Sequence, residues 1–235
     1  MANAIKRNIP NAITSLNLLC GCIALVFIFH NELVAASWMV IFAGIADLFD
    51  GMAARLLKVS SPIGKELDSL ADMVSFGVVP GMMVFQLINN IYFEWAGLCI
   101  TVFAALRLAK FNIDTRQATS FIGVPTPAIA LFIASFPLIL AHSETWNSIY
   151  SSNITLVCWF FAIVSVVCSA LMVLPIRLLS MKATNLSWGA NKARYILVLS
   201  SLLAIIVFQF SAVPIIFLLY ILFSLIANPA GAKHE

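Results

Sequence analysis

The chain has 235 residues, of which 62% are hydrophobic and only 10% are charged, and its mean hydropathy is +1.03. Soluble proteins carry about 25% charged residues, so a soluble core of this size cannot hide so much apolar surface. The composition therefore excludes a soluble domain and predicts an all-α, polytopic membrane bundle. The pI near 8.7 would suggest nucleic-acid binding in a soluble protein. Membrane orientation explains the basic residues better here, and we expect no nucleic-acid partner.

Apolar runs of about 20 residues, the length needed to cross a bilayer, recur along the whole chain. No small-residue cleavage site stands out after the first run, so we expect it to remain as an uncleaved first span. In total we predict eight transmembrane helices. Their expected ranges are 12–29, 34–54, 67–88, 92–111, 126–141, 154–174, 193–209 and 213–228.

The basic residues predict the orientation of these helices. With eight spans, all 13 Lys and Arg residues fall in one compartment or within a helical turn of it, whereas the opposite connections contain none. The positive-inside rule then makes both termini cytoplasmic, and we expect the protein to lie in the inner (cytoplasmic) membrane. The loop 175–194 carries four of the basic residues and is predicted to lie along anionic headgroups.

Four aspartates interrupt the apolar background at the predicted cytoplasmic ends of the second and third spans: Asp47, Asp50, Asp68 and Asp72. The first two are three residues apart and the last two are four apart, so each pair occupies one face of a helix. The break at 60–62 predicts an antiparallel helix pair that brings the two faces together. Ionisable groups at membrane depth are costly and by default mark a functional site.

Carboxylates at close range repel one another unless cations neutralise them. Hard divalent ions such as Mg²⁺ or Mn²⁺ do this with oxygen ligands, and substrate phosphates often complete the coordination sphere. Two such ions about 3.5–4 Å apart stabilise the attacking and leaving oxygens of a phosphoryl transfer. Two other interpretations stay open: a cytoplasmic loop whose carboxylates pair with Arg55, Lys58 and Lys65, or a pathway for protons or cations.

Small and polar residues accompany the aspartates. Asn11, Thr14 and Asn17 recur at every third position and so line one face of the first predicted span. This face either contacts neighbouring helices or forms one wall of a polar pocket. Gly51 and Ala54 follow the first aspartate pair. A glycine inside a helix costs roughly 1 kcal/mol relative to Ala, which suggests that a helix or a ligand approaches closely there.

The fourth predicted span ends in a second polar group: Arg107, Lys110, Asn112 and, after the span, Arg116. Lys110 and Arg116 also fit simple anchors to the cytoplasmic surface. Arg107 lies one turn deeper, where a plain surface anchor is less natural. The two prolines within 124–127 are predicted to unwind the entry to the fifth span and expose backbone nearby.

The aspartates belong to a longer pattern of eight residues at fixed spacings: Asp47, Asp50, Gly51, Ala54, Arg55, Gly64, Asp68 and Asp72. This pattern is identified, without a departure, as the signature of the CDP-alcohol phosphatidyltransferase family. At residues 10–17, 107–112 and 121–128 the chain resembles the phosphatidylserine synthase branch of that family. Lys110 stands where we expect Arg, which keeps the charge but loses the planar guanidinium. The resemblance covers about residues 5–130.

The resemblance implies that the chain transfers a phosphatidyl group from CDP-diacylglycerol to the hydroxyl of L-serine and releases CMP. It places the four aspartates in a divalent-metal site, for which two Mn²⁺ or Mg²⁺ ions are expected, and makes Asp72 the general base. The residues expected to bind the CDP moiety are Asn11, Thr14, Asn17, Gly51, Ala54, Arg55 and Gly64. The acceptor or phosphate residues are expected to be Arg107, Lys110, Asn112 and Arg116. A homodimer is implied by the resemblance alone.

Two other functions remain as alternatives. The acceptor could be a phosphate-bearing alcohol such as glycerol 3-phosphate or inositol phosphate, although few extra cations lie near Arg107 to bind that phosphate. A cation-coupled transporter could use the same carboxylates, but the outer halves of the spans have almost no ionisable groups to carry ions across. We expect a single membrane domain over residues 1–235, with a family-like core at 5–174 and a loop with two further spans at 175–235.

Overall fold

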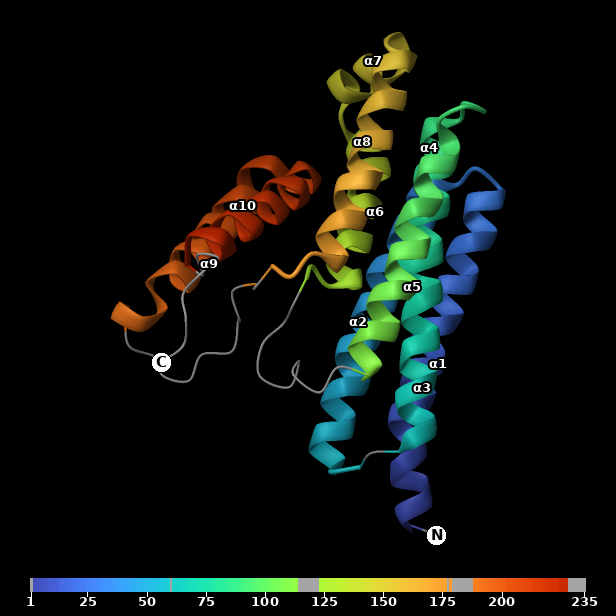
Figure 1. The fold of residues 1–235 in the computed structure, drawn as a ribbon, viewed down its shortest axis with the longest axis vertical. Helices are drawn as coiled ribbons and strands as arrows, with labels where there is room; N and C mark the ends of the chain where they lie inside the picture. Colours follow the sequence, from blue (N-terminus) through green and yellow to red (C-terminus); the bar gives the residue numbers. More distant parts are fainter. Residues whose placement is uncertain (1, 60, 114–122, 177, 179–187, 228–235) are drawn as a thin grey trace.

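The structure is a computed structural model of the chain, and it describes residues 2–59, 61–113, 123–176, 178 and 188–227 (Figure 1). All regular elements within these residues are helical, which confirms the predicted fold class. The α-helices are α1 (Ala2–Phe29), α2 (Leu33–Leu57), α3 (Pro62–Asp72), α4 (Val79–Ile88), α5 (Gly97–Ile113), α6 (Thr126–His142), α7 (Glu144–Ser152), α8 (Ile154–Val173), α9 (Trp188–Phe208) and α10 (Ala212–Ala227). A π-helical turn, Met73–Val78, joins α3 to α4, and short 3₁₀ turns occupy Glu94–Ala96 and Gln209–Ser211.

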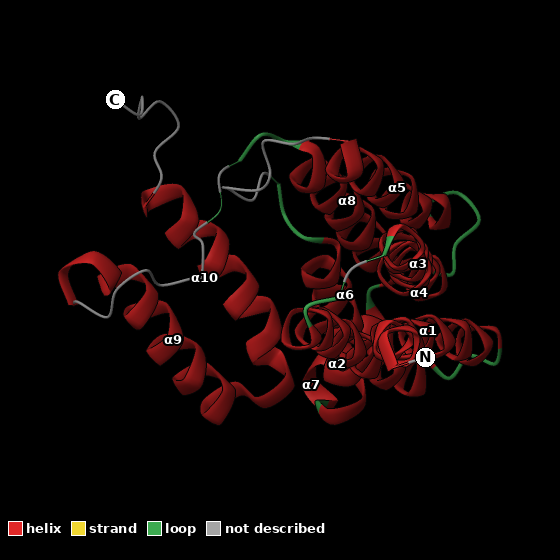
Figure 2. Cartoon of the chain, turned by 90° about the horizontal axis from the view of Figure 1, so that it is seen from below, coloured by secondary structure: helices red, strands yellow, loops and turns green. Residues whose placement is uncertain are grey.

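Six helical segments in the described part of the chain are long and apolar enough to cross a membrane, or seven if the bent pair of α6 and α7 is one span. The chain is therefore an integral membrane protein, but the predicted count of eight is not confirmed. Helix α6 has only 17 residues and bends by 101° into α7. At the other end, α9 and α10 belong to one apolar stretch, Tyr195–Ile226, and lie side by side around a turn (Figures 1 and 2).

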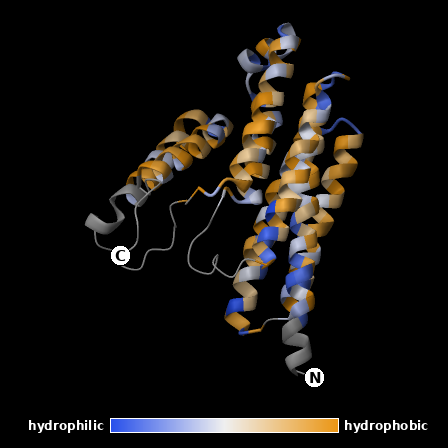
Figure 3. Cartoon of the chain, in the orientation of Figure 1, coloured by the Kyte–Doolittle hydropathy of each residue, from blue (hydrophilic) through white to orange (hydrophobic). Residues whose placement is uncertain are grey.

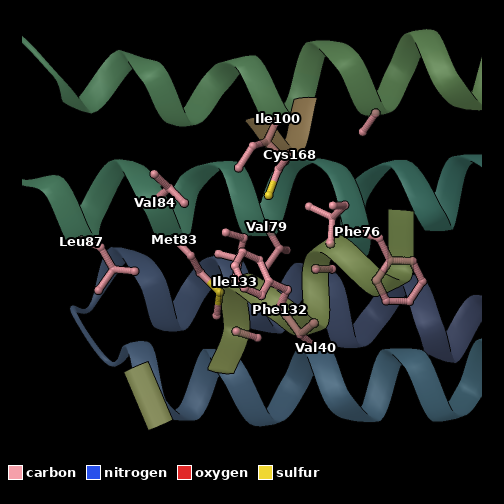
Figure 4. Packing of buried hydrophobic residues seen from close by; sticks show 14 of the residues in the cluster. Val40, Phe76, Val79, Met83, Val84, Leu87, Ile100, Phe132, Ile133 and Cys168 are labelled. Atoms are coloured by element: carbon pink, nitrogen blue, oxygen red, sulfur yellow. The ribbon is translucent and has the colours of Figure 1, made fainter. Parts of the chain in front are cut away.

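The continuous helix from Pro62 to Ile88 runs through the middle of the bundle. It has the largest buried share of any candidate span, and Figure 2 shows α4 and α6 at the centre with α1, α2, α5 and α8 around them. Its fully buried side chains Phe76 and Met83 pack with Ile133 and other apolar residues of the core (Figure 4). Hydrophilic residues instead gather in the lower parts of α2, α3 and α5 (Figure 3).

Helices α4 and α5 approach each other almost backbone to backbone. A Cβ atom on Gly97 would lie 2.4 Å from the carbonyl oxygen of Gly81, a separation that no side chain tolerates. The hydroxyl of Thr101 donates a hydrogen bond to the carbonyl oxygen of Gly77 at 3.1 Å, which ties α5 to the π-helical turn. Small residues permit such close crossings in membranes, and this crossing positions Arg107 further along α5.

The bent α6–α7 pair is fastened to α4 by one hydrogen bond. The Tyr150 hydroxyl donates to the carbonyl oxygen of Leu87 at 2.6 Å. This carbonyl belongs to the last turn of α4, where helix carbonyls have no partner within the helix. The Tyr150 hydroxyl therefore gives the Leu87 carbonyl oxygen a hydrogen-bond donor that the end of α4 does not supply.

Replacing this hydroxyl gives a test of the fold. We expect Tyr150→Phe to lose about 1 kcal/mol of stability, the usual net value of a hydrogen bond, and to lower Tm by roughly 2–4 °C in detergent. Tyr92, which is 86% exposed, provides the matched control, and Tyr92→Phe should leave Tm unchanged. Equal Tm values for the two variants would contradict the role given to Tyr150.

Candidate active site

A tight turn between α2 and α3 reverses the chain at the lower end of the bundle. Lys58 takes a left-handed conformation with φ 53°, and its N–H donates to the carbonyl oxygen of Arg55, which ends α2. Ser61 then caps α3, because its side chain accepts a hydrogen bond from the Gly64 N–H at 2.9 Å. Pro62 at the first position of α3 suits a helix start, where an N–H would be unpaired anyway.

This reversal brings the carboxylates of the two helices together. Ligand oxygens of Asp47, Asp50 and Asp68 all lie within 4.8 Å of one another. Asp72, one turn after Asp68, lies within electrostatic range of the other three carboxylates. Asp50 is only 7% exposed, and the others are partly buried. The geometry thus matches the predicted convergence of two aspartate pairs.

Helix α1 holds two of these carboxylates in place. The Thr14 hydroxyl donates to Asp50 Oδ2 at 2.7 Å, and the Asn17 amide donates to Asp72 Oδ1 at 3.4 Å. Both Thr14 and Asn17 are buried. The backbone of Asn17 is itself fixed, because its carbonyl oxygen accepts a hydrogen bond from the Ser75 hydroxyl at 3.0 Å. The polar face of α1 therefore does both things that its spacing suggested: it contacts neighbouring helices and it borders the candidate site.

A pocket of about 270 Å³ opens beside the aspartates, between α1, α2 and α3. The residues that line it are Pro10, Asn11, Thr14, Asp50, Gly51, Ala54, Val59, Ser61, Gly64, Lys65 and Asp68. Most of the residues expected to bind CDP are among them. Asn17 is not, and instead contacts Asp72. Arg55 also lies outside the lining and is exposed, with its Nε donating to the carbonyl oxygen of Gly51 at 2.9 Å.

The two glycines of this pocket differ in what surrounds them. A Cβ atom on Gly64 would lie 2.8 Å from Asn11 Oδ1 and 2.9 Å from Ser61 Oγ, so the protein itself requires a small residue there. A Cβ atom on Gly51 would have no neighbour closer than Arg55 Nη2 at 3.9 Å. Gly51 lines the pocket, so a methyl group there would extend into its open space.

Arg107 is buried near the aspartates, in agreement with its position one turn inside the predicted span. It is 9% exposed, lies within electrostatic range of Asp72, and donates from Nη1 to Thr126 Oγ1 at 3.3 Å. Its Nε is buried with no hydrogen-bond partner. An unsatisfied buried donor costs about 1–3 kcal/mol, and more if charged. A ligand that supplies an acceptor would remove this cost.

The other residues of the predicted acceptor group are placed differently. Lys110 is exposed, and Arg116 lies outside the described residues. Asn112 joins α5 to α3, because its side-chain amide donates to Ser69 Oγ at 2.9 Å and its carbonyl oxygen accepts from Lys65 Nζ at 3.2 Å. Asn112 therefore positions Lys65, a cation that lines the pocket and that spacing alone suggests only as a possible partner of the aspartates.

The basic residues near the aspartates are engaged elsewhere. Arg55 bonds to a backbone carbonyl of its own helix, and Lys65 bonds to the carbonyl of Asn112. Among the residues that the structure describes, no Lys or Arg forms an ion pair with any of the four carboxylates. This argues against a loop in which the aspartates are neutralised by neighbouring lysines.

Comparisons with known proteins agree with this geometry. Residues 7–164 match the model of the CDP-alcohol phosphatidyltransferase family. The chain is 31% identical over 223 residues to a CDP-diacylglycerol–serine O-phosphatidyltransferase of Helicobacter pylori strain J99, which covers 92% of this chain and 89% of that protein. It is 40% identical over 143 residues to the enzyme of the same name from Bacillus subtilis strain 168, covering 57% and 80%.

A third relative comes from an archaeon. The archaetidylserine synthase of Methanothermobacter thermautotrophicus is 32% identical over 145 residues, which covers 58% of this chain and 60% of that protein. The family model matches well over half of the chain and contains every signature residue, from Asp47 to Asp72. The chain therefore belongs to the CDP-alcohol phosphatidyltransferase family.

Proposed function

We propose that this protein transfers the phosphatidyl group of CDP-diacylglycerol to the hydroxyl of L-serine, giving phosphatidylserine and CMP. The observation that carries the proposal is the convergence of Asp47, Asp50 and Asp68 within 4.8 Å, next to a pocket lined by other residues of the family signature. Serine as the acceptor is supported by relatives that carry a serine transferase name at 31–40% identity.

The carboxylates fit a divalent metal. Their hard oxygen atoms are the ligands that Mg²⁺ and Mn²⁺ prefer, and no ion pair neutralises them in the described part of the chain. Asp47, Asp50 and Asp68 would hold the metal together with Asp72, and two ions are expected. When bound, the metal supplies positive charge to the substrate diphosphate and to the leaving CMP.

The pocket between α1, α2 and α3 takes the CDP moiety. Gly51 and Ala54 present a surface without long side chains, against which a nucleotide can lie. Lys65 lines the same pocket and offers its ammonium group to the diphosphate, an interaction that is strong because both partners are charged. Arg55 stands at the pocket edge, since its Nη2 lies 3.9 Å from the place a Gly51 Cβ would take.

Asp72 serves as the general base. The Asn17 amide donates to one of its carboxylate oxygens, which orients the carboxylate toward the acceptor. Asp72 removes the proton from the serine hydroxyl, and the serine oxygen forms a bond to the phosphorus that carries the diacylglycerol. The bond from that phosphorus to CMP breaks, CMP leaves with the electron pair, and the proton on Asp72 passes to solvent. Arg107 binds the serine carboxylate, because a guanidinium matches that group in charge and shape.

The site faces the cytoplasm at the inner membrane. Arg55, Lys58 and Lys65 all lie at the end of the bundle that holds the aspartates, in agreement with the positive-inside rule. Leu48 and Phe49, next to the aspartates on α2, are more than half exposed. They offer apolar surface along which the acyl chains of the substrate can remain in the bilayer while serine enters from water. A homodimer remains part of the proposal.

Turnover of CDP-diacylglycerol tests this function directly. We expect CMP release by the detergent-solubilised protein to require L-serine and Mn²⁺ or Mg²⁺. Asp68→Asn should lower the rate more than about 100-fold, since loss of even an outer-shell partner costs roughly 10–100-fold. Glu66→Gln, an exposed position on the same helix, is the control and should retain activity. CMP release with glycerol 3-phosphate but not serine, or none with any alcohol, would refute the proposal.

A second variant tests the nucleotide pocket. Gly51→Ala places a methyl group in space that the protein leaves open, so we expect normal folding and a KM for CDP-diacylglycerol at least several-fold higher, with the KM for serine unchanged. Gly44→Ala on the same helix, where a Cβ meets nothing within 4 Å, should leave both KM values alone. A Gly51→Ala enzyme with wild-type kinetics would place the nucleotide elsewhere.

A further inference from the structure

The partner that holds Arg107 is an uncharged residue. Thr126, at the start of α6, is fully buried, and its Oγ1 accepts the hydrogen bond from Arg107 Nη1 at 3.3 Å. A buried arginine more often pairs with a carboxylate, which neutralises the cation and accepts two parallel hydrogen bonds from the guanidinium N–H groups. A hydroxyl fixes the guanidinium without neutralising it. Asp72 lies within electrostatic range of Arg107, but among the described residues the guanidinium donates its hydrogen bond to Thr126 and not to that carboxylate. Its Nε still lacks an acceptor, so the guanidinium can bind an anionic ligand.

Thr126 is itself held rigidly. It belongs to the segment Gly123–Pro127, which we call the α6 strap, and the strap is hydrogen-bonded to the last turn of α8 and to Ile176, three residues after that helix. The Gly123 N–H donates to the carbonyl oxygen of Ile176, and the Val124 N–H donates to that of Leu171, both at 3.0 Å. Val124 is fully buried. Two prolines flank Thr126 and restrict the backbone further.

Gly123 shows how closely the strap lies on α8. Its φ of +77° is in the region that favours glycine, and a Cβ atom there would lie 2.4 Å from the carbonyl oxygen of Met172. The strap therefore cannot shift along α8 without losing both backbone hydrogen bonds. The position of the Thr126 hydroxyl, and with it that of the Arg107 guanidinium, is set by the packing of α8 against α5.

We propose that Thr126 is a positioning residue for the acceptor: it holds the Arg107 guanidinium beside Asp72, so that the cation meets the carboxylate of an α-amino acid whose hydroxyl faces the base. This inference rests on the proposed function, and it goes further by naming the residue that sets the affinity for the amino acid. Thr126 itself contributes no charge and touches no reacting atom. Its removal weakens acceptor binding because the guanidinium loses its fixed position.

The experiment compares three variants of the full-length protein. Thr126→Val keeps the shape of the side chain and removes the acceptor oxygen, whereas Thr126→Ser keeps the oxygen. Ser135→Ala is the matched control, because Ser135 is a buried hydroxyl on the same helix that donates a hydrogen bond to the carbonyl oxygen of Phe132, one turn away on that helix. The serine and CDP-diacylglycerol dependence of CMP release is measured for each, together with Tm.

We expect Thr126→Val to raise the KM for serine about tenfold or more and to leave the KM for CDP-diacylglycerol unchanged. Thr126→Ser should return the serine KM to within about twofold of wild type, and Ser135→Ala should match wild type. Unfolded protein lowers the measured rate but does not change KM, so the serine KM can still be compared for a variant that is partly unfolded. If Thr126→Val yields no folded protein, Thr126→Ala carries the same expectation.

A serine KM unchanged in Thr126→Val would overturn the inference, as would an equal rise in both KM values, which a merely structural role predicts. The same holds if Ser135→Ala reproduces the effect. A wild-type protein that releases no CMP with serine would instead refute the proposed function, so the two failures are distinguishable.

Discussion

The carboxylates of α2 and α3 repel one another, and the surrounding helices hold them together against that repulsion. Asp47, Asp50 and Asp68 lie within 4.8 Å of one another in a bundle that is otherwise apolar, where charges are screened far less than in water. Helix packing forces this arrangement, and no described basic residue relieves it by an ion pair. Either protonation or a bound cation can relieve this repulsion, and the metal-dependent phosphoryl transfer proposed above uses the second.

The scaffold around the aspartates fixes their geometry from three sides. Helix α1 donates hydrogen bonds to two carboxylates, the tight turn at Lys58 sets the spacing of α2 and α3, and the close crossing at Gly97 brings α5 with Arg107 to the same place. The acceptor side is built by a more distant contact, in which α8 holds Thr126 against Arg107. The proposed nucleotide and acceptor sites thus depend on different helices, and substitutions should separate their effects.

Local periodicity explains which features were predictable from the sequence. The three- and four-residue spacings of the aspartates predicted their two faces, and the helix break predicted their convergence. The hydrogen bond from Arg107 to Thr126 joins residues 19 apart in the chain and leaves no periodic signal, so it was missed. The predicted count of eight spans rests on apolar runs alone. It is not confirmed, because α6 is short and bends into α7 and because α9 and α10 share one apolar stretch, Tyr195–Ile226. The contact of Asn17 with Asp72 is likewise not predictable, because spacing reveals a face but not what lies opposite it.

Direct binding of Mn²⁺ tests the central claim most closely, because it does not require turnover. The purified protein in detergent is titrated with Mn²⁺, and the electron paramagnetic resonance signal of the free ion reports how much is bound. We predict saturable binding by the wild type and at least tenfold weaker binding by Asp50→Asn. This substitution replaces the least exposed of the four carboxylates with an uncharged amide. Equal binding by the two proteins, or none by the wild type in the presence of CDP-diacylglycerol, would contradict the account.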